Sequence, residues 1–156
     1  MIKSVLALTA LLVAAPAWGG SVTPREGWSV HDTDLTHAAL FDRLKAAVKA
    51  EGLIIVTRAG PTKAAANRGI KIPDNMVVGV YNNDYAVRAL ALSTAAMIEA
   101  PIRFYLTGDD DGTATLSYKL PSTVFAPYFD EGGDDLRALA AELDEKFAAI
   151  AEVATN

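Results

Sequence analysis

The sequence predicts a single two-layer α+β domain, with helices packed on one face of a mainly antiparallel sheet and a long C-terminal helix. Residues 100–122 show the alternation of apolar and polar side chains that is typical of a half-buried β-hairpin. Residues 136–150 carry apolar side chains at helical spacing, which predicts the long amphipathic helix. Strand and helix patterns alternate before the hairpin, and together they account for one domain.

The first strand is expected at residues 28–31, where apolar side chains alternate with polar ones. Thr36 is expected to cap the following helix, because its hydroxyl can accept a hydrogen bond from a free N–H of the first turn. Gly52 is expected to end that helix in a left-handed conformation. Residues 53–57 form a continuous apolar run, which predicts a strand covered on both faces.

Three further elements lead to the hairpin. Pro61 and Gly69 are expected to bound a short helix, because proline is tolerated in a first turn and glycine stops a helix. Residues 76–81 predict the next strand, and Asn83 or Asp84 is expected to cap the helix after it.

The alternation of side chains in the hairpin limits the number of residues that its loop can have. Because side chains alternate along a strand, the apolar sides of the two strands meet only if the loop has an odd number of residues. A loop of Asp110, Asp111 and Gly112 satisfies this, with Gly112 in the left-handed position. This register predicts that Phe104 lies opposite Tyr118.

The N-terminus is typical of a cleavable export signal. Residues 1–19 combine a short positive region ending at Lys3, an apolar segment at 4–15 and small residues before a cleavage point. The apolar segment is shorter than the roughly 20 residues that span a bilayer. We therefore expect an exported, periplasmic protein, with a linker at residues 20–26 and one domain at residues 27–153.

Composition narrows the function classes. Without Lys3 the mature chain has 13 Lys and Arg against 19 Asp and Glu, a formal charge of −6. This charge disfavours nucleic acid and anionic membranes as partners, because phosphate binding needs clustered cations. The chain has no cysteine, which excludes thiol catalysis and thiolate-held metals. No cofactor is expected.

The two histidines are the weak candidates for metal chemistry. His31, Asp34 and His37 lie in one short segment, and imidazole and carboxylate ligands suit zinc or copper. The alternative is an ordinary polar connection between a strand and a helix. No serine lies in a nucleophile elbow, and none is expected to have a histidine partner.

The acidic run at residues 109–112 does not match a calcium-binding EF-hand loop. That loop needs a glutamate six residues after its glycine, and Tyr118 occupies the position. An acidic hairpin tip accounts for these residues.

A set of polar and aromatic residues gives the preferred function. Asn82, Arg103, Tyr105 and Tyr118 are the candidate ligand contacts, since Tyr and Arg dominate binding hot spots. The alternative is an ordinary solvated sheet face whose tyrosines favour strand formation. We expect a non-catalytic module that binds a small ligand or a protein partner. The second hypothesis is an enzyme, metal-assisted or acid–base, that uses His31 and His37.

Six short blocks follow one another in a characteristic order: Gly69–Pro73, Val77–Asn82, Ala100–Ile102, Asp111-Gly112, Leu116–Tyr118 and Pro121. Through these blocks the chain from Gly27 to Phe129 resembles the bacterial family known as domain of unknown function 302. It implies a small α+β domain with no established reaction, often a homodimer. A homodimer formed through the hairpin edge or the C-terminal helix is the third hypothesis for this chain. Asn82 matches the asparagine of a family turn, although Tyr81-Asn82-Asn83 stands where the family usually has Gly-Asn-Pro.

Overall fold

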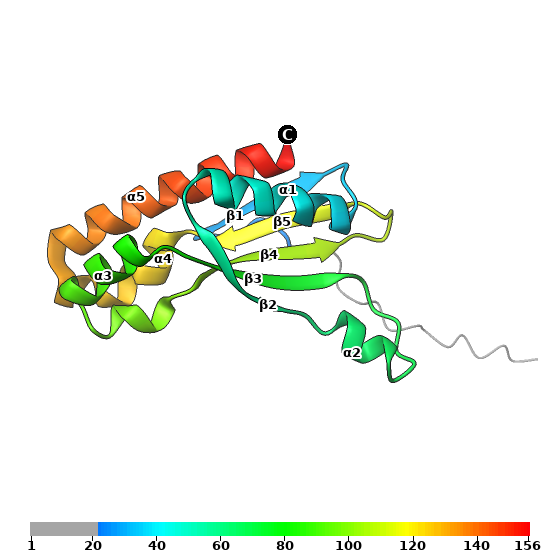
Figure 1. The fold of residues 1–156 in the computed structure, drawn as a ribbon, viewed down its shortest axis with the longest axis horizontal. Helices are drawn as coiled ribbons and strands as arrows, with labels where there is room; N and C mark the ends of the chain where they lie inside the picture. The colour runs from blue at the N-terminus through cyan, green and yellow to red at the C-terminus, as the bar shows by residue number, and fades with distance from the viewer. Residues whose placement is uncertain (1–21) are drawn as a thin grey trace, which may run out of the picture.

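Five strands form one antiparallel sheet in the order β1-β5-β4-β3-β2. The computed structural model describes residues 22–156, and Figure 1 shows their arrangement. In chain order the elements are β1 (Trp28–Thr33), α1 (His37–Ala50), β2 (Ile54–Ala59), α2 (Thr62–Ala66), β3 (Asn75–Tyr81), α3 (Asn83–Leu92), η1 (Ala96–Glu99), β4 (Ile102–Gly108), β5 (Ala114–Lys119), α4 (Pro121–Phe125), η2 (Ala126–Tyr128) and α5 (Phe129–Thr155).

The two longest helices form the second layer. α1 and α5 pack against each other and against the central strands on one face of the sheet (Figure 1). α3, α4 and the 3-10 turns gather at one end of α5, whereas α2 lies at the other end of the molecule, beyond β2 (Figure 1). The predicted two-layer α+β fold and the long C-terminal helix are confirmed.

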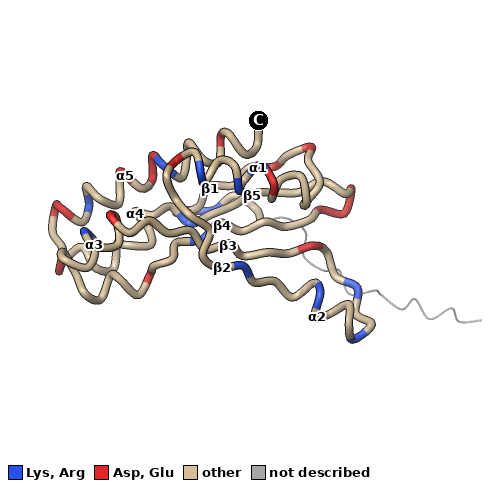
Figure 2. The backbone as a smooth tube through the Cα atoms, in the orientation of Figure 1, with Lys and Arg blue, Asp and Glu red and all other residues tan. Residues whose placement is uncertain are grey.

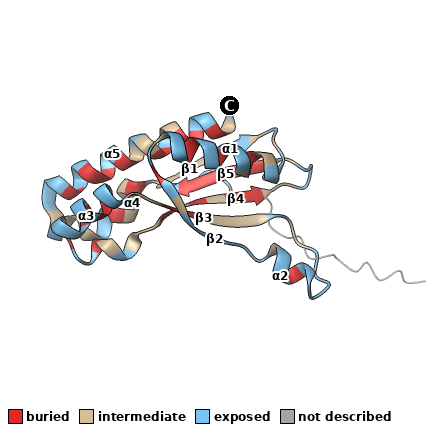
Figure 3. Ribbon diagram, in the orientation of Figure 1, coloured by how far each residue is buried: buried red, intermediate tan, exposed pale blue. Residues whose placement is uncertain are grey.

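Three aromatic rings form the centre of the core. Phe104 of β4 stacks on Phe147 of α5 with ring centroids 4.5 Å apart. Tyr118 of β5 meets both, at 5.2 Å from Phe104 and 5.4 Å from Phe147. Burial is accordingly concentrated on β4, β5 and the inward sides of α1 and α5 (Figure 3). These contacts join the hairpin to the C-terminal helix.

The register predicted for the hairpin is confirmed. Phe104 lies opposite Tyr118, and the Asp109 N–H donates to the Thr113 carbonyl at 2.9 Å across the start of the loop. Three residues remain between these two. Gly112 has a φ of +89°, the left-handed conformation that glycine adopts without a steric penalty.

The prediction that residues 53–57 form a strand covered on both faces is wrong. β2 is an edge strand, paired only with β3 among the described strands, and Ile54 is 60% exposed. A bulge between Ile55 and Thr57 shifts its register, which twists an edge away from further pairing. An apolar run predicts a strand, but its position in the sheet depends on distant partners.

The helix boundaries follow local capping chemistry. The Thr36 side chain accepts from the Ala39 N–H at 3.3 Å, as predicted. At the other end of α1, the Gly52 N–H donates to Lys49 and the Leu53 N–H donates to Val48. This pair of bonds is a Schellman motif, in which the left-handed residue satisfies the last carbonyls of the helix.

The long helix contains a local break. Gly133 has a φ of +59° within α5, so the regular helix restarts at the following residue. Asp134 and Asp135 therefore lie in its first turn, where negative charge interacts favourably with the helix dipole.

Residues 1–21 lie outside the described residues, and with them the predicted signal at 1–19 and part of the linker at 20–26. Within residues 22–156, no helix has the length and apolar composition that crossing a membrane requires.

Replacing Phe147 with alanine should lower the free energy of unfolding by about 3–5 kcal/mol, because it removes the ring on which Phe104 and Tyr118 pack. Urea unfolding measures the loss. Ile98→Ala is the control: that side chain is 78% exposed, and its removal should change stability by less than about 0.5 kcal/mol. Equal losses in the two variants would contradict the assignment of this ring cluster as the centre of the core.

Candidate functional site

One face of the sheet points away from α1 and α5, and we call it the open face. Antiparallel register brings alternate residues of four strands together on it. Its members are Trp28, Val30 and Asp32 of β1, Thr115, Ser117 and Lys119 of β5, Arg103, Tyr105 and Thr107 of β4, and Asn75, Val77 and Gly79 of β3.

A hollow in the open face, the open-face groove, is the strongest candidate site. Its volume of about 470 Å³ lies within the range of about 300–1,000 Å³ that small-molecule pockets occupy. The described residues that line it are Trp28, Asn75, Val77, Ile102, Arg103, Tyr105, Tyr118, Lys119 and Val124. These residues combine cationic, aromatic and aliphatic side chains.

The cations of the groove have few acidic partners. The Arg103 guanidinium is 3.8 Å from the Glu99 carboxylate, a long ion pair in which the arginine is 58% exposed. Lys119 lies over the Trp28 ring at 5.8 Å and makes no ion pair with another residue between 22 and 156. Both positive charges therefore remain available to an anion in the groove.

Tyr105 is held in place by its neighbour. The Asn75 side-chain amide donates to the Tyr105 hydroxyl oxygen, which joins β3 and β4 across the open face. Because the oxygen accepts this bond, its own O–H remains free to donate to a ligand. Arg103 and Tyr105 thus both line the open-face groove.

Tyr118 borders the same groove but belongs mainly to the core. It is only 2% exposed, and its ring packs against both Phe104 and Phe147. Burial raises the pKa of its hydroxyl above the usual value, with a smaller opposing effect from the hydrogen bond to Ser29. Its ring can shape the groove wall, while little of its surface is accessible to a ligand.

Asn82 is separated from the other three candidates. Its side-chain oxygen accepts from the Asp84 and Tyr85 N–H groups, and its amide donates to the Gly52 carbonyl at 2.9 Å. Asn82 itself is therefore the N-cap of α3, and the prediction that Asn83 or Asp84 caps this helix is wrong. The turn begins one residue earlier because β3 already ends at Tyr81.

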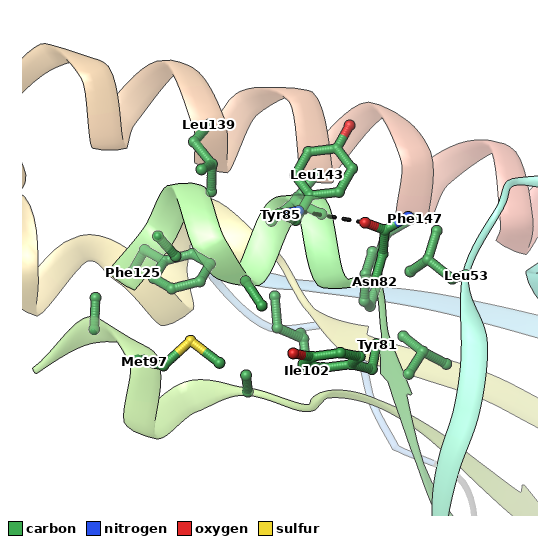
Figure 4. A pocket seen from close by; sticks show the side chains of 15 residues that line it. Leu53, Tyr81, Asn82, Tyr85, Met97, Ile102, Phe125, Leu139, Leu143 and Phe147 are labelled. Atoms are coloured by element: carbon green, nitrogen blue, oxygen red, sulfur yellow. Dashed lines mark hydrogen bonds between the residues drawn. The ribbon is translucent and has the colours of Figure 1, made fainter. Parts of the chain in front are cut away.

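The cavity beside Asn82 is too small for a ligand of ordinary size. Figure 4 shows it between α3, α5 and the end of the sheet, lined by side chains such as Met97, Phe125 and Leu139. Its volume is about 40 Å³. Apolar cavities that bind benzene measure about 150 Å³. We attribute this space to imperfect packing of small alanine side chains.

The three weak metal candidates are not assembled into a site. Within residues 22–156, no group of three or more His, Cys, Asp or Glu side chains could hold a metal ion. His31 contacts the Tyr118 ring in a stacked arrangement, whereas His37 lies in a separate hollow beside Arg58 and Asp74.

A serine–histidine pair was missed at the level of sequence. Ser29 Oγ lies 2.7 Å from His31 Nε2 on the helix-facing side of β1. Residues two apart on a strand share a face, so this spacing could have predicted the contact. Burial lowers the pKa of His31, against a smaller opposing effect from Asp32. The neutral ring is therefore favoured in the folded protein.

Comparison with known proteins identifies the family of this chain. The model of the domain of unknown function DUF302 matches residues 30–154, most of the chain. The chain belongs to the DUF302 family. The crystal structure of an uncharacterized conserved DUF302 protein from Bacillus stearothermophilus superposes with a TM-score of 0.74. It shares 17% identity, and the match covers 85% of this chain and 100% of that one, which shows a common fold. A search of curated proteins gave no match.

Asn82→Ala should destabilise this DUF302 domain by about 0.5–2 kcal/mol, because the first turn of α3 loses its cap. Asn82→Asp keeps the capping oxygen and loses the donor to Gly52, so it should cost less. Chemical denaturation of both variants measures the difference. Equal stability of the alanine variant and the wild type would contradict the capping role.

The DUF302 domain should lose stability as the pH falls below about 6.5, the ordinary histidine pKa. The unfolded chain then takes up a proton that His31 in the folded domain resists, since burial lowers its pKa. His31→Gln should flatten this slope between pH 8 and 5.5 in thermal unfolding. His37→Gln, the matched control, should leave the contribution of His31 in place. If the stability of the His31 variant changes with pH as steeply as that of the wild type, the pH dependence does not come from His31.

Proposed function

We propose that this DUF302 protein is exported and that its domain is a non-catalytic binding module for a small anionic molecule with an apolar or aromatic body. The observation that carries the proposal is the meeting of Arg103 and Lys119 with Trp28 and Tyr105 in one groove. Guanidinium and ammonium groups bind carboxylate, phosphate or sulfonate oxygens. Aromatic rings offer a broad surface for the remainder of the ligand.

The distribution of charge in the protein supports the proposal that the ligand carries an anionic group. The whole chain has a formal charge of −5, yet both ionised side chains that line the groove are positive. A local positive potential in an acidic protein attracts anions to one place and disfavours their binding elsewhere. The free Tyr105 hydroxyl proton adds a donor for the same oxygen atoms.

The lining also supports binding rather than catalysis. Among the described residues that line the groove there is no His, Asp, Glu, Ser or Cys. General acid–base catalysis uses His most often, and we assign Lys119 and Tyr105 of the lining to binding the anion rather than to proton transfer. The histidines of the enzyme hypothesis lie away from this lining, His31 on the helix-facing side of β1 and His37 at the start of α1.

Export is supported by the signal-like pattern of residues 1–19 and would place the domain in the periplasm. Intact mass measurement of protein from the periplasmic fraction tests this directly. The homodimer stays a prediction, which analytical sedimentation would test.

The groove is tested with two dyes that share a ring system. 1-Anilinonaphthalene-8-sulfonate carries a sulfonate, and N-phenyl-1-naphthylamine lacks it. Arg103→Gln and Lys119→Gln should each weaken sulfonate-dye binding about tenfold or more, since a charge-assisted contact contributes about 1.5–3 kcal/mol. Binding of the neutral dye should stay nearly unchanged. Fluorescence titration measures both affinities.

Arg43→Gln is the matched control, because it removes one positive charge from the exposed surface of α1, on the covered side of the sheet. It should leave both dyes unaffected. The proposal is overturned if Arg103→Gln and Arg43→Gln behave alike, or if the groove variants weaken both dyes equally.

A further inference from the structure

A second polar cluster lies on the open face, at the end where β4 and β5 turn. Asp32, Thr115 and Thr107 stand side by side on three neighbouring strands, paired in register. Asp109 joins them from the first position after β4, with its Oδ2 2.9 Å from Thr115 Oγ1. Together these four side chains form what we call the hydroxyl–carboxylate cluster.

The Thr115 hydroxyl has two carboxylate partners but only one proton to donate. Thr115 Oγ1 lies 2.9 Å from Asp32 Oδ1 and 2.9 Å from Asp109 Oδ2. A hydroxyl has a single proton, so it makes one full hydrogen bond or shares that proton weakly between two acceptors. At least one of the two contacts is therefore incompletely satisfied, and a proton on a carboxyl or a cation against both oxygens would satisfy it.

Two further oxygens of the cluster have no partner. Thr107 Oγ1 and Asp109 Oδ1 are buried, and neither makes a hydrogen bond to any described residue. Thr107 is only 5% exposed and lies directly opposite Thr115 on the same sheet face. Buried polar groups without partners are rare in native proteins, and each indicates a missing interaction. Both oxygens belong to residues next to Thr115, Thr107 by strand pairing and Asp109 by its hydrogen bond.

The surrounding negative charge favours the binding of a cation at this cluster. Asp34, Asp110 and Asp111 lie in the adjoining loops, and acidic residues gather at this end of the sheet (Figure 2). The cation that borders the same region is Lys71, in the hollow beside Asp109.

We propose that the hydroxyl–carboxylate cluster binds one hard divalent cation of the calcium class. All the available ligands are oxygens, from two carboxylates and two threonine hydroxyls, and calcium accepts such mixed sets with water in the remaining positions. Asp32 is exposed to solvent, which leaves room for those waters. Two carboxylates suggest a dissociation constant of about 10⁻⁴–10⁻³ M. The site is separate from the open-face groove and does not depend on the proposed function.

Calcium titration of the chelator-treated full chain tests the site by calorimetry and thermal unfolding. One Ca²⁺ should bind and raise the melting temperature, and Mg²⁺ should bind more weakly because it demands stricter geometry. Asp109→Asn should lower calcium affinity about tenfold or more, since it removes a charged ligand. Asp110→Asn removes the same charge from the exposed hairpin tip and should bind calcium nearly as the wild type does.

Thr107→Val provides a variant with an independent readout. It removes an unpartnered buried hydroxyl, so the calcium-free protein should become no less stable, while its response to calcium should fall. The proposal is overturned if wild-type protein shows no response to 10 mM Ca²⁺, or if Asp109→Asn and Asp110→Asn lose binding equally. It is also overturned if acid rather than calcium stabilises the wild type relative to Asp109→Asn, because a shared proton then explains the cluster.

Discussion

The register between β4 and β5 determines which chemistry faces the helices and which faces away from them. Because the loop holds three residues, Phe104 and Tyr118 point to the same side, where Phe147 of α5 packs on both. A shift by one residue would move one whole set of side chains to the other face. The aromatic cluster and the open face are therefore two consequences of one pairing.

The neighbouring strands extend this division across the sheet. β1 pairs with β5 so that Trp28 lies beside Lys119, and β3 pairs with β4 so that Asn75 reaches the Tyr105 hydroxyl. One end of the open face becomes cationic and aromatic, whereas the hairpin end becomes acidic through Asp32 and Asp109. An antiparallel sheet with a single helical layer can carry two sites of opposite charge on its other side.

The candidate site residues differ in how much each one contributes to the stability of the fold. Asn82 resembles a functional residue in sequence because of its position in a family turn, yet its side chain is fully used in capping α3 and holding Gly52. Tyr118 borders the groove while its ring stabilises the core. Arg103 makes only a long ion pair with Glu99, and Lys119 only lies over the Trp28 ring. Both side chains are exposed, which makes them the clearest candidates for function.

The sequence by itself determined the local structure of this protein. Alternation in the hairpin predicted the strands and the odd loop, Thr36 and Gly52 predicted the ends of α1, and the motif order predicted the DUF302 family. Those features depend on residues close together in the chain, so periodicity and capping chemistry are sufficient.

Only the tertiary structure decided the rest. It placed β2 at the edge, joined Trp28 to Lys119, and brought Asp32 to Asp109 from a segment far away in sequence. Ser29 and His31 are close in sequence, but their contact depends on β1 extending as a strand. Strand order and register come from long-range pairing, which local patterns of hydrophobicity do not encode, and both proposed sites are products of that pairing.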